Sequence, residues 1–96
     1  MVLTILDAEV DESKWALLKQ TYEREVTGLP PSIHQSFLIQ SKQEPRLWRV
    51  VTHWQSQADL DEMRATTEVP VAVRIFRAAQ AEPVFSSWDV AVHAKQ

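Results

Sequence analysis

The sequence predicts one α+β domain with the element order strand, helix, strand, strand, helix pair, strand. Three observations lead to this prediction. The chain opens on a β-branched, apolar run and closes on a segment whose apolar side chains alternate, and both features are typical of strands. Two segments between them repeat apolar residues every three or four positions, which is typical of helices. The length of 96 residues suits a single domain, which we expect to span residues 1–96.

The first strand is expected from Val2 to about Val10, and a helix follows it. Residues 11–13 are Asp-Glu-Ser, and acidic side chains at this point suit the positive end of a helix dipole. The apolar face of the predicted helix holds Trp15, Leu18, Tyr22 and Val26. We expect the helix to end at Gly28 in a left-handed conformation, before Pro30 and Pro31.

Two β-rich runs, 33–40 and 46–54, are separated by the polar residues 41–45 and predict an antiparallel hairpin. If Gln40 pairs with Pro45, one face of the hairpin combines His34, Ser36, Leu38, Leu47, Arg49, Val51 and His53. The opposite face then combines Ile33, Gln35, Phe37, Ile39, Trp48, Val50, Thr52 and Trp54. A shift of one residue would rearrange both sets.

The second helical region is predicted in two parts. Ser56 starts the first part as a cap, and residues 66–69 interrupt the pattern. Pro70 fits the first turn of a further helix, although residues 71–76 also alternate as a strand would. The last strand is expected from Val84 to about Val92.

Composition excludes several classes of protein. The chain has no Cys, which removes disulfides and thiolate chemistry, and its single Gly leaves no glycine-rich phosphate loop. A net charge of −3 argues against nucleic acid as a partner. No apolar run approaches the ~20 residues of a membrane span, and residues 1–11 do not resemble a secretory signal. We therefore expect a cytoplasmic protein with no membrane partner.

Apolar side chains are predicted on both faces of the sheet. Leu47 and Val51 lie on one face of the third strand, and Trp48, Val50 and Trp54 lie on the other. The helices of one chain cover one face, so we expect a second subunit to cover the other, giving a homodimer packed sheet to sheet. The alternative is an exposed patch that binds a different molecule.

The run Trp54-Gln55-Ser56-Gln57-Ala58 resembles the antibiotic biosynthesis monooxygenase family, in which a strand ends in Trp before a small capping residue and an amphipathic helix. The element order, the length and the interrupted helical region extend the resemblance over nearly the whole chain. It implies a ferredoxin-like protomer with a four-stranded antiparallel sheet, and a dimeric α/β barrel. Characterised members oxidise hydroquinones, anthrones or similar phenols with O2 and no cofactor, and another branch degrades haem.

The resemblance extends to the fold more than to the catalytic residues of the family. The haem-degrading branch uses an Asn, a helical Trp and a later His, whereas this chain has no Asn and places Met63 and Val73 at the other two positions. These mismatches exclude the haem-degrading branch and favour a non-catalytic role more than the fold alone would. Because the resemblance spans the chain, it still implies a cofactor-independent monooxygenase that acts with O2 on a small aromatic phenol or hydroquinone. The alternative is a non-catalytic dimeric barrel that binds a small hydrophobic ligand or acts as a stress-response or interaction module.

The predicted site lies in the cleft between the sheet and the helices. We predict that His53 accepts the phenol proton and that Arg49 holds the phenolate. The alternative for this pair is an interfacial role, paired with an acidic residue across a dimer seam. The candidate ligand-binding residues are Trp48, Trp54, Tyr22 and His34, with core packing or surface exposure as their alternatives. The three histidines fall on three predicted strands, so we expect no metal site. The resemblance implies that no cofactor is needed.

Overall fold

The computed structural model describes residues 1–67 and 69–96, and it has the predicted element order. Four strands form one antiparallel sheet in the order β2-β3-β1-β4. Their bounds are Val2–Glu9 for β1, Ile33–Gln40 for β2, Leu47–Trp54 for β3 and Val84–Asp89 for β4. The helices are α1 (Trp15–Glu25), α2 (Gln57–Thr66) and α3 (Val71–Ala78), with a short 3-10 turn, η1 (Glu12–Lys14), before α1. This is the ferredoxin-like α+β arrangement expected from the sequence.

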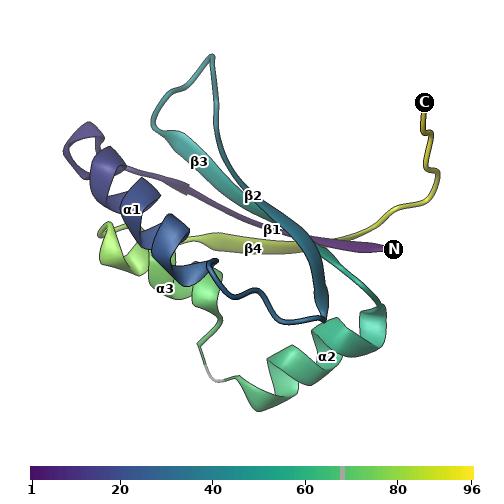
Figure 1. Ribbon diagram of the computed structural model, residues 1–96. Helices are drawn as coiled ribbons and strands as arrows, with labels where there is room; N and C mark the ends of the chain where they lie inside the picture. Colours follow the sequence, from purple (N-terminus) through teal and green to yellow (C-terminus); the bar gives the residue numbers. More distant parts are fainter. Residues whose placement is uncertain (68) are drawn as a thin grey trace.

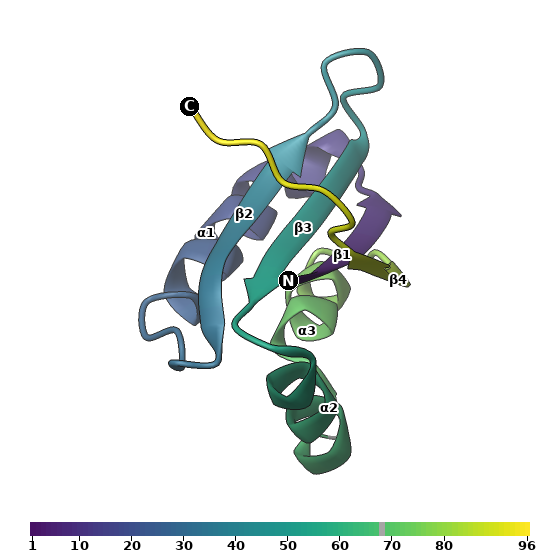
Figure 2. The same cartoon turned by 90° about the vertical axis from the view of Figure 1, so that its right-hand side faces the viewer.

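Two helices cover one face of the sheet. Figure 1 shows α1 and α3 side by side on that face, while α2 lies beyond the end of the sheet. Figure 2 shows the other face of the sheet, which no helix covers. We call this uncovered side of the sheet the open face. Within the described ranges 1–67 and 69–96, no helix has the length and apolar character that crossing a membrane requires.

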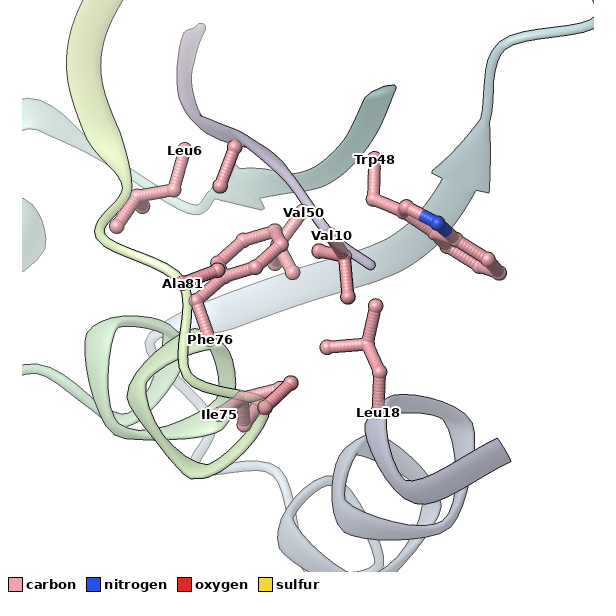
Figure 3. Close-up of a cluster of buried hydrophobic side chains, with 10 residues drawn as sticks. Leu6, Val10, Leu18, Trp48, Val50, Ile75, Phe76 and Ala81 are labelled. Carbon is pink, nitrogen blue, oxygen red and sulfur yellow. The ribbon is translucent and has the colours of Figure 1, made fainter. Parts of the chain in front are cut away.

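The main core lies between the sheet and the helices α1 and α3. Side chains of β1 and β3 meet side chains of both helices in Figure 3. Phe76, Leu18 and Val10 are fully buried there, and Ile75 is nearly so. A smaller cluster joins Val2, Trp54 and Leu60 near the start of α2. Burial of these apolar surfaces is the main force that holds the helices on the sheet.

The start of α2 follows the predicted chemistry, but one predicted helix end is wrong. The side chain of Ser56 accepts a hydrogen bond from the Asp59 backbone N–H at 3.1 Å and so caps α2. The α1 helix ends at Glu25, and Val26 closes it by donating to the carbonyl of Tyr22 at 3.0 Å. Gly28 is therefore beyond the helix, and its φ is not in the left-handed region. Val26 has a φ of −95° and a ψ of 5°, which a residue with a side chain can adopt, so this ending needs no glycine.

Two further expectations concern the C-terminal third. Residues 71–76 lie in α3, so the helix predicted after Pro70 is confirmed over the alternative strand. The last strand ends at Asp89 rather than near Val92. The backbone N–H of Val90 donates to the carbonyl of Met1 at 3.0 Å, and the chain beyond has no regular structure because β1 offers no further partner.

The hairpin register differs from the one we expected, and the difference exchanges the two faces of β2. Gln40 pairs with Trp48 rather than with Pro45, and Leu38 pairs with Val50. Leu38 therefore packs under the helices, whereas Phe37 lies on the open face. The predicted assignment of β2 faces is wrong because side chains alternate with a period of two, so an odd shift in register inverts them.

Candidate functional site

A cavity of about 390 Å³ lies between the helix-covered face of the sheet and all three helices. Its floor is formed by buried residues of the sheet, among them Thr4, Val50 and Thr52. Its sides come from α1, α2, α3 and the segment that joins α1 to β2. Exposed lining residues, such as Leu29 and Val71, mark its opening. This volume is within the range of small-molecule sites, which are usually concave and largely apolar.

Two hydroxyl-bearing pairs supply polar groups inside the cavity. The Tyr22 hydroxyl donates to Ser36 Oγ at 2.9 Å and so joins α1 to β2. The Trp54 indole nitrogen donates to Thr4 Oγ1, also at 2.9 Å, and joins β3 to β1. All four side chains line the cavity. A hydroxyl both donates and accepts, so each pair leaves hydrogen-bonding capacity for a ligand oxygen.

Charged side chains at the cavity are few. In the described part of the lining they are Glu25 of α1 and Arg64 of α2. Glu25 is paired with Arg74 of α3, whose Nη2 lies 3.8 Å from the carboxylate. Arg64 lies over the ring of Phe85 on β4, with its guanidinium carbon 5.0 Å from the ring centroid. The sequence does not indicate Arg64 or Ser36 as residues of a site. Arg64 occupies an exposed helix position, and Ser36 lies on β2, whose two faces were predicted the wrong way round.

The predicted ligand-binding residues divide between two places. Tyr22 and Trp54 line the cavity, as the hypothesis of a sheet–helix cleft requires. Trp48 is buried at the other end of β3 and packs edge to face against Trp15, with ring centroids 5.9 Å apart. His34 lies outside the cavity, against His53.

The predicted catalytic pair does not reach the cavity. Arg49 and His53 alternate along β3 with the buried residues that face the helices, so both lie on the open face. The expectation that they form the polar end of the sheet–helix cleft is therefore wrong in its geometry. Arg49 instead lies opposite Asp7 of β1, with Nε 3.8 Å from the carboxylate, so its acidic partner lies in the same chain.

His53 and His34 form a second cluster on the open face. A register shift between Ile33 and Gln35 brings the His34 ring to 4.8 Å from the His53 ring, measured between centroids. Partial burial lowers the pKa of His53, and nearby His34, the terminal amine and His93 lower it further. Among the residues of 1–67 and 69–96, no group of three or more metal-ligating side chains is arranged to hold a metal ion.

Solved structures share this fold over almost their whole length. The chain matches SnoaB, a cofactor-independent oxygenase from Streptomyces nogalater, with a TM-score of 0.76, 12% identity, and coverage of 99% of this chain and 97% of that one. It matches a structure described as an antibiotic biosynthesis monooxygenase with a TM-score of 0.70, 17% identity, and coverage of 96% and 100%. A variant of MhuD that holds two manganese protoporphyrin IX molecules per active site matches with a TM-score of 0.73, 16% identity and full coverage of both chains, 100% each.

These matches confirm the predicted fold and the resemblance to antibiotic biosynthesis monooxygenases at the level of the fold. No family model matches the sequence, and no curated protein matches it. This chain is only 12–17% identical to the three structures. At such low identity the shared fold does not establish the chemistry, which has to be argued from the residues of the cavity.

Proposed function

We propose that this protein is a monooxygenase that binds a small aromatic phenol or hydroquinone in the cavity and oxidises it with O2. The observation that carries the proposal is the cavity itself, which is mainly apolar and holds two hydroxyl-bearing pairs, Tyr22–Ser36 and Trp54–Thr4. The fold shared with a protein named as a cofactor-independent oxygenase supports it. An apolar enclosure suits a flat ring system, and a few fixed polar groups suit its oxygen atoms.

The proposed reaction needs few catalytic groups from the protein. A phenol that loses its proton to solvent at the opening becomes electron-rich enough to react with O2. O2 then adds at the ring carbon para to the oxygen, and loss of water converts that C–H to C=O, so that one oxygen atom enters the quinone and the other leaves as water. A hydrogen bond from the Ser36 hydroxyl, whose oxygen already accepts one from Tyr22, to the phenolate oxygen would favour the anion, because it stabilises charge more than it stabilises the neutral phenol. His53 and Arg49 are not part of this proposal, since both lie on the other side of the sheet.

We also propose that the open face is covered by a second copy of the chain. Phe37, Ile39, Val84 and Trp88 are 49%, 44%, 66% and 56% exposed, and their strand positions place them on this face. Large apolar side chains gathered on one uncovered sheet are typical of an interface. A sheet-to-sheet homodimer would bury them and leave each cavity, which lies on the helix side, accessible.

The test is oxygen uptake with a panel of hydroquinones, anthrones and naphthols, after subtraction of autoxidation at each pH. We expect saturable uptake by the wild-type protein. Ala72→Phe places a ring in the cavity and should abolish it, whereas Ala65→Phe, on the exposed side of α2 and outside the cavity lining, should not. Uptake that survives Ala72→Phe would place the reaction elsewhere.

One observation favours a second function, binding without catalysis. In the described part of the lining, the ionisable groups that could accept a proton are Glu25, which is already paired with Arg74, and Tyr22. A cavity with no free general base suits a binding protein as well as an enzyme. No uptake above background, together with quenching of tryptophan fluorescence by the same compounds, would establish this alternative.

A further inference from the structure

The opening of the cavity carries a positively charged side chain that is held in place by an aromatic ring. Arg64 lies in the last turn of α2, is exposed, and lines the cavity. Its guanidinium carbon is 5.0 Å from the centroid of the Phe85 ring, which lines the same cavity from β4. A guanidinium over an aromatic face is attracted to the ring through its charge, and this contact does not require its N–H groups. The contact therefore favours a position of Arg64 at the opening and leaves its N–H donors for a ligand.

The acidic side chain of the cavity does not offset this charge. Glu25 is the acidic residue in the described part of the lining, and it lies 3.8 Å from Arg74 Nη2. Its negative charge is thus balanced by a residue outside the lining. Within the part of the lining that the structure describes, the remaining charge is that of Arg64, and it favours an anion at the opening.

We propose that the cavity takes an aromatic acid, with the ring system inside and the carboxylate bound by Arg64 at the opening. The inference rests on the proposed function and adds the class of substrate to it. Leu6, Val50 and Ile75 line the interior and would cover an apolar ring. A carboxylate at the exposed opening loses little hydration, and a planar guanidinium binds it through two parallel hydrogen bonds.

Two probes of similar shape test the proposal, 2-naphthoate and its neutral counterpart 2-naphthamide, with affinities measured by calorimetry at low salt. We expect the wild-type protein to bind naphthoate about tenfold more tightly, the gain typical of one exposed charge-assisted pair. Arg64→Gln should remove this preference by lowering the affinity for naphthoate much more than the affinity for naphthamide. Arg64→Lys should restore part of it, since the charge returns without the planar fork. Arg24→Gln, an exposed arginine of α1 outside the lining, is the control and should change neither affinity.

Equal affinities for the two probes in the wild-type protein would overturn the inference, and so would a naphthoate preference that survives Arg64→Gln. In both cases binding of naphthamide would leave the proposed cavity function standing. If neither probe binds and no compound of the oxygen-uptake panel reacts, the proposed function fails and the inference fails with it. Circular dichroism of each variant shows that a lost preference does not come from a lost fold.

Discussion

Trp54 donates its indole N–H to the hydroxyl of Thr4 across 2.9 Å, and both side chains are buried in the wall of the cavity. Trp48 lies on the same face of the same strand and is also buried, but its indole nitrogen has no hydrogen-bond partner among the described residues. Its ring is held by edge-to-face packing on Trp15 instead. Two tryptophans of β3 are therefore fixed by different forces, one by a hydrogen bond and one by packing.

This difference predicts unequal costs for the same substitution. Both Trp54→Phe and Trp48→Phe lose ring volume, but Trp54→Phe also leaves the buried Thr4 hydroxyl without its donor, whereas Trp48→Phe removes an unpaired N–H. We expect the free energy of unfolding to fall by about 1–2 kcal/mol more for Trp54→Phe than for Trp48→Phe. Urea unfolding at constant protein concentration measures both values. Equal losses would show that the Thr4 bond contributes nothing.

Removal of one hydroxyl from the cavity should slow the proposed reaction. Tyr22→Phe deletes the donor to Ser36 and should lower kcat/KM for oxygen uptake about tenfold, which corresponds to one hydrogen bond to a charged oxygen. Ser36→Ala should produce a similar loss, and the double variant should lose little more because the two hydroxyls act as a unit. Additive losses would mean that each hydroxyl contacts the substrate independently.

The element order could be predicted from the sequence because the signals for the elements are local, although residues 71–76 fit both a helix and a strand. The alternation in β3 correctly separates Trp48, Val50 and Trp54 from Arg49 and His53. Capping by Ser56 and the break before Pro70 likewise depend on neighbouring residues alone. These features depend on neighbouring residues and not on the rest of the chain, so they can be predicted from local sequence patterns.

The site could be predicted only in part, because it depends on register and on contacts between distant elements. β2 carries apolar residues on both of its faces, Leu38 on one and Phe37 on the other, so its pattern does not indicate which face packs under the helices. Arg64 occupies an ordinary exposed helix position, and its relation to Phe85 of β4 exists only after folding. Tyr22 and Trp54 line the cavity, and they stand out in the sequence because they are large aromatic residues with a polar atom.

The open face predicts how the chain associates. Phe37→Glu places a charge among the exposed apolar residues of that face, and we expect it to convert a dimer into a monomer at micromolar concentration because an interface core excludes unpaired charge. Leu17→Glu is a matched control, since Leu17 is 41% exposed on the outer side of α1. Sedimentation equilibrium distinguishes the two. A wild-type monomer near 11.0 kDa would refute the proposed dimer outright.

The turn after α3 offers a stabilising substitution. Gln80 follows the helix with a φ of 59°, in the left-handed region that glycine adopts without steric cost. Gln80→Gly should raise the free energy of unfolding by up to about 1 kcal/mol, since relief of strain exceeds the added entropy of the unfolded chain. Gln20→Gly, at an exposed position inside α1, should lower it by about the same amount. A loss of stability at both positions would contradict the assigned strain.

Protonation of His53 should make the free energy of unfolding depend on pH over a limited range. Partial burial, followed by the His34 ring at 4.8 Å, keeps the pKa of His53 below its ordinary value of 6.5. Unfolding removes these influences, so below about pH 6.5 the unfolded chain binds a proton that the folded chain does not. The free energy of unfolding should therefore fall as the pH decreases from about 6.5 through the folded pKa, and this group should have no effect at higher pH.

His53→Gln should remove that dependence, and urea unfolding between about pH 5 and 7.5 measures it. The two carboxylates with lowered pKa values act in a different pH range. Hydrogen bonds from Ser13 and from Arg77 lower the pKa values of Asp11 and Glu82 below 3.8 and 4.5, so their stabilisation is lost only at more acidic pH. His34→Gln should shift the transition toward higher pH, because the remaining ring then loses a neighbouring positive charge and binds its proton more readily. An unchanged slope in His53→Gln would mean that another group controls this window.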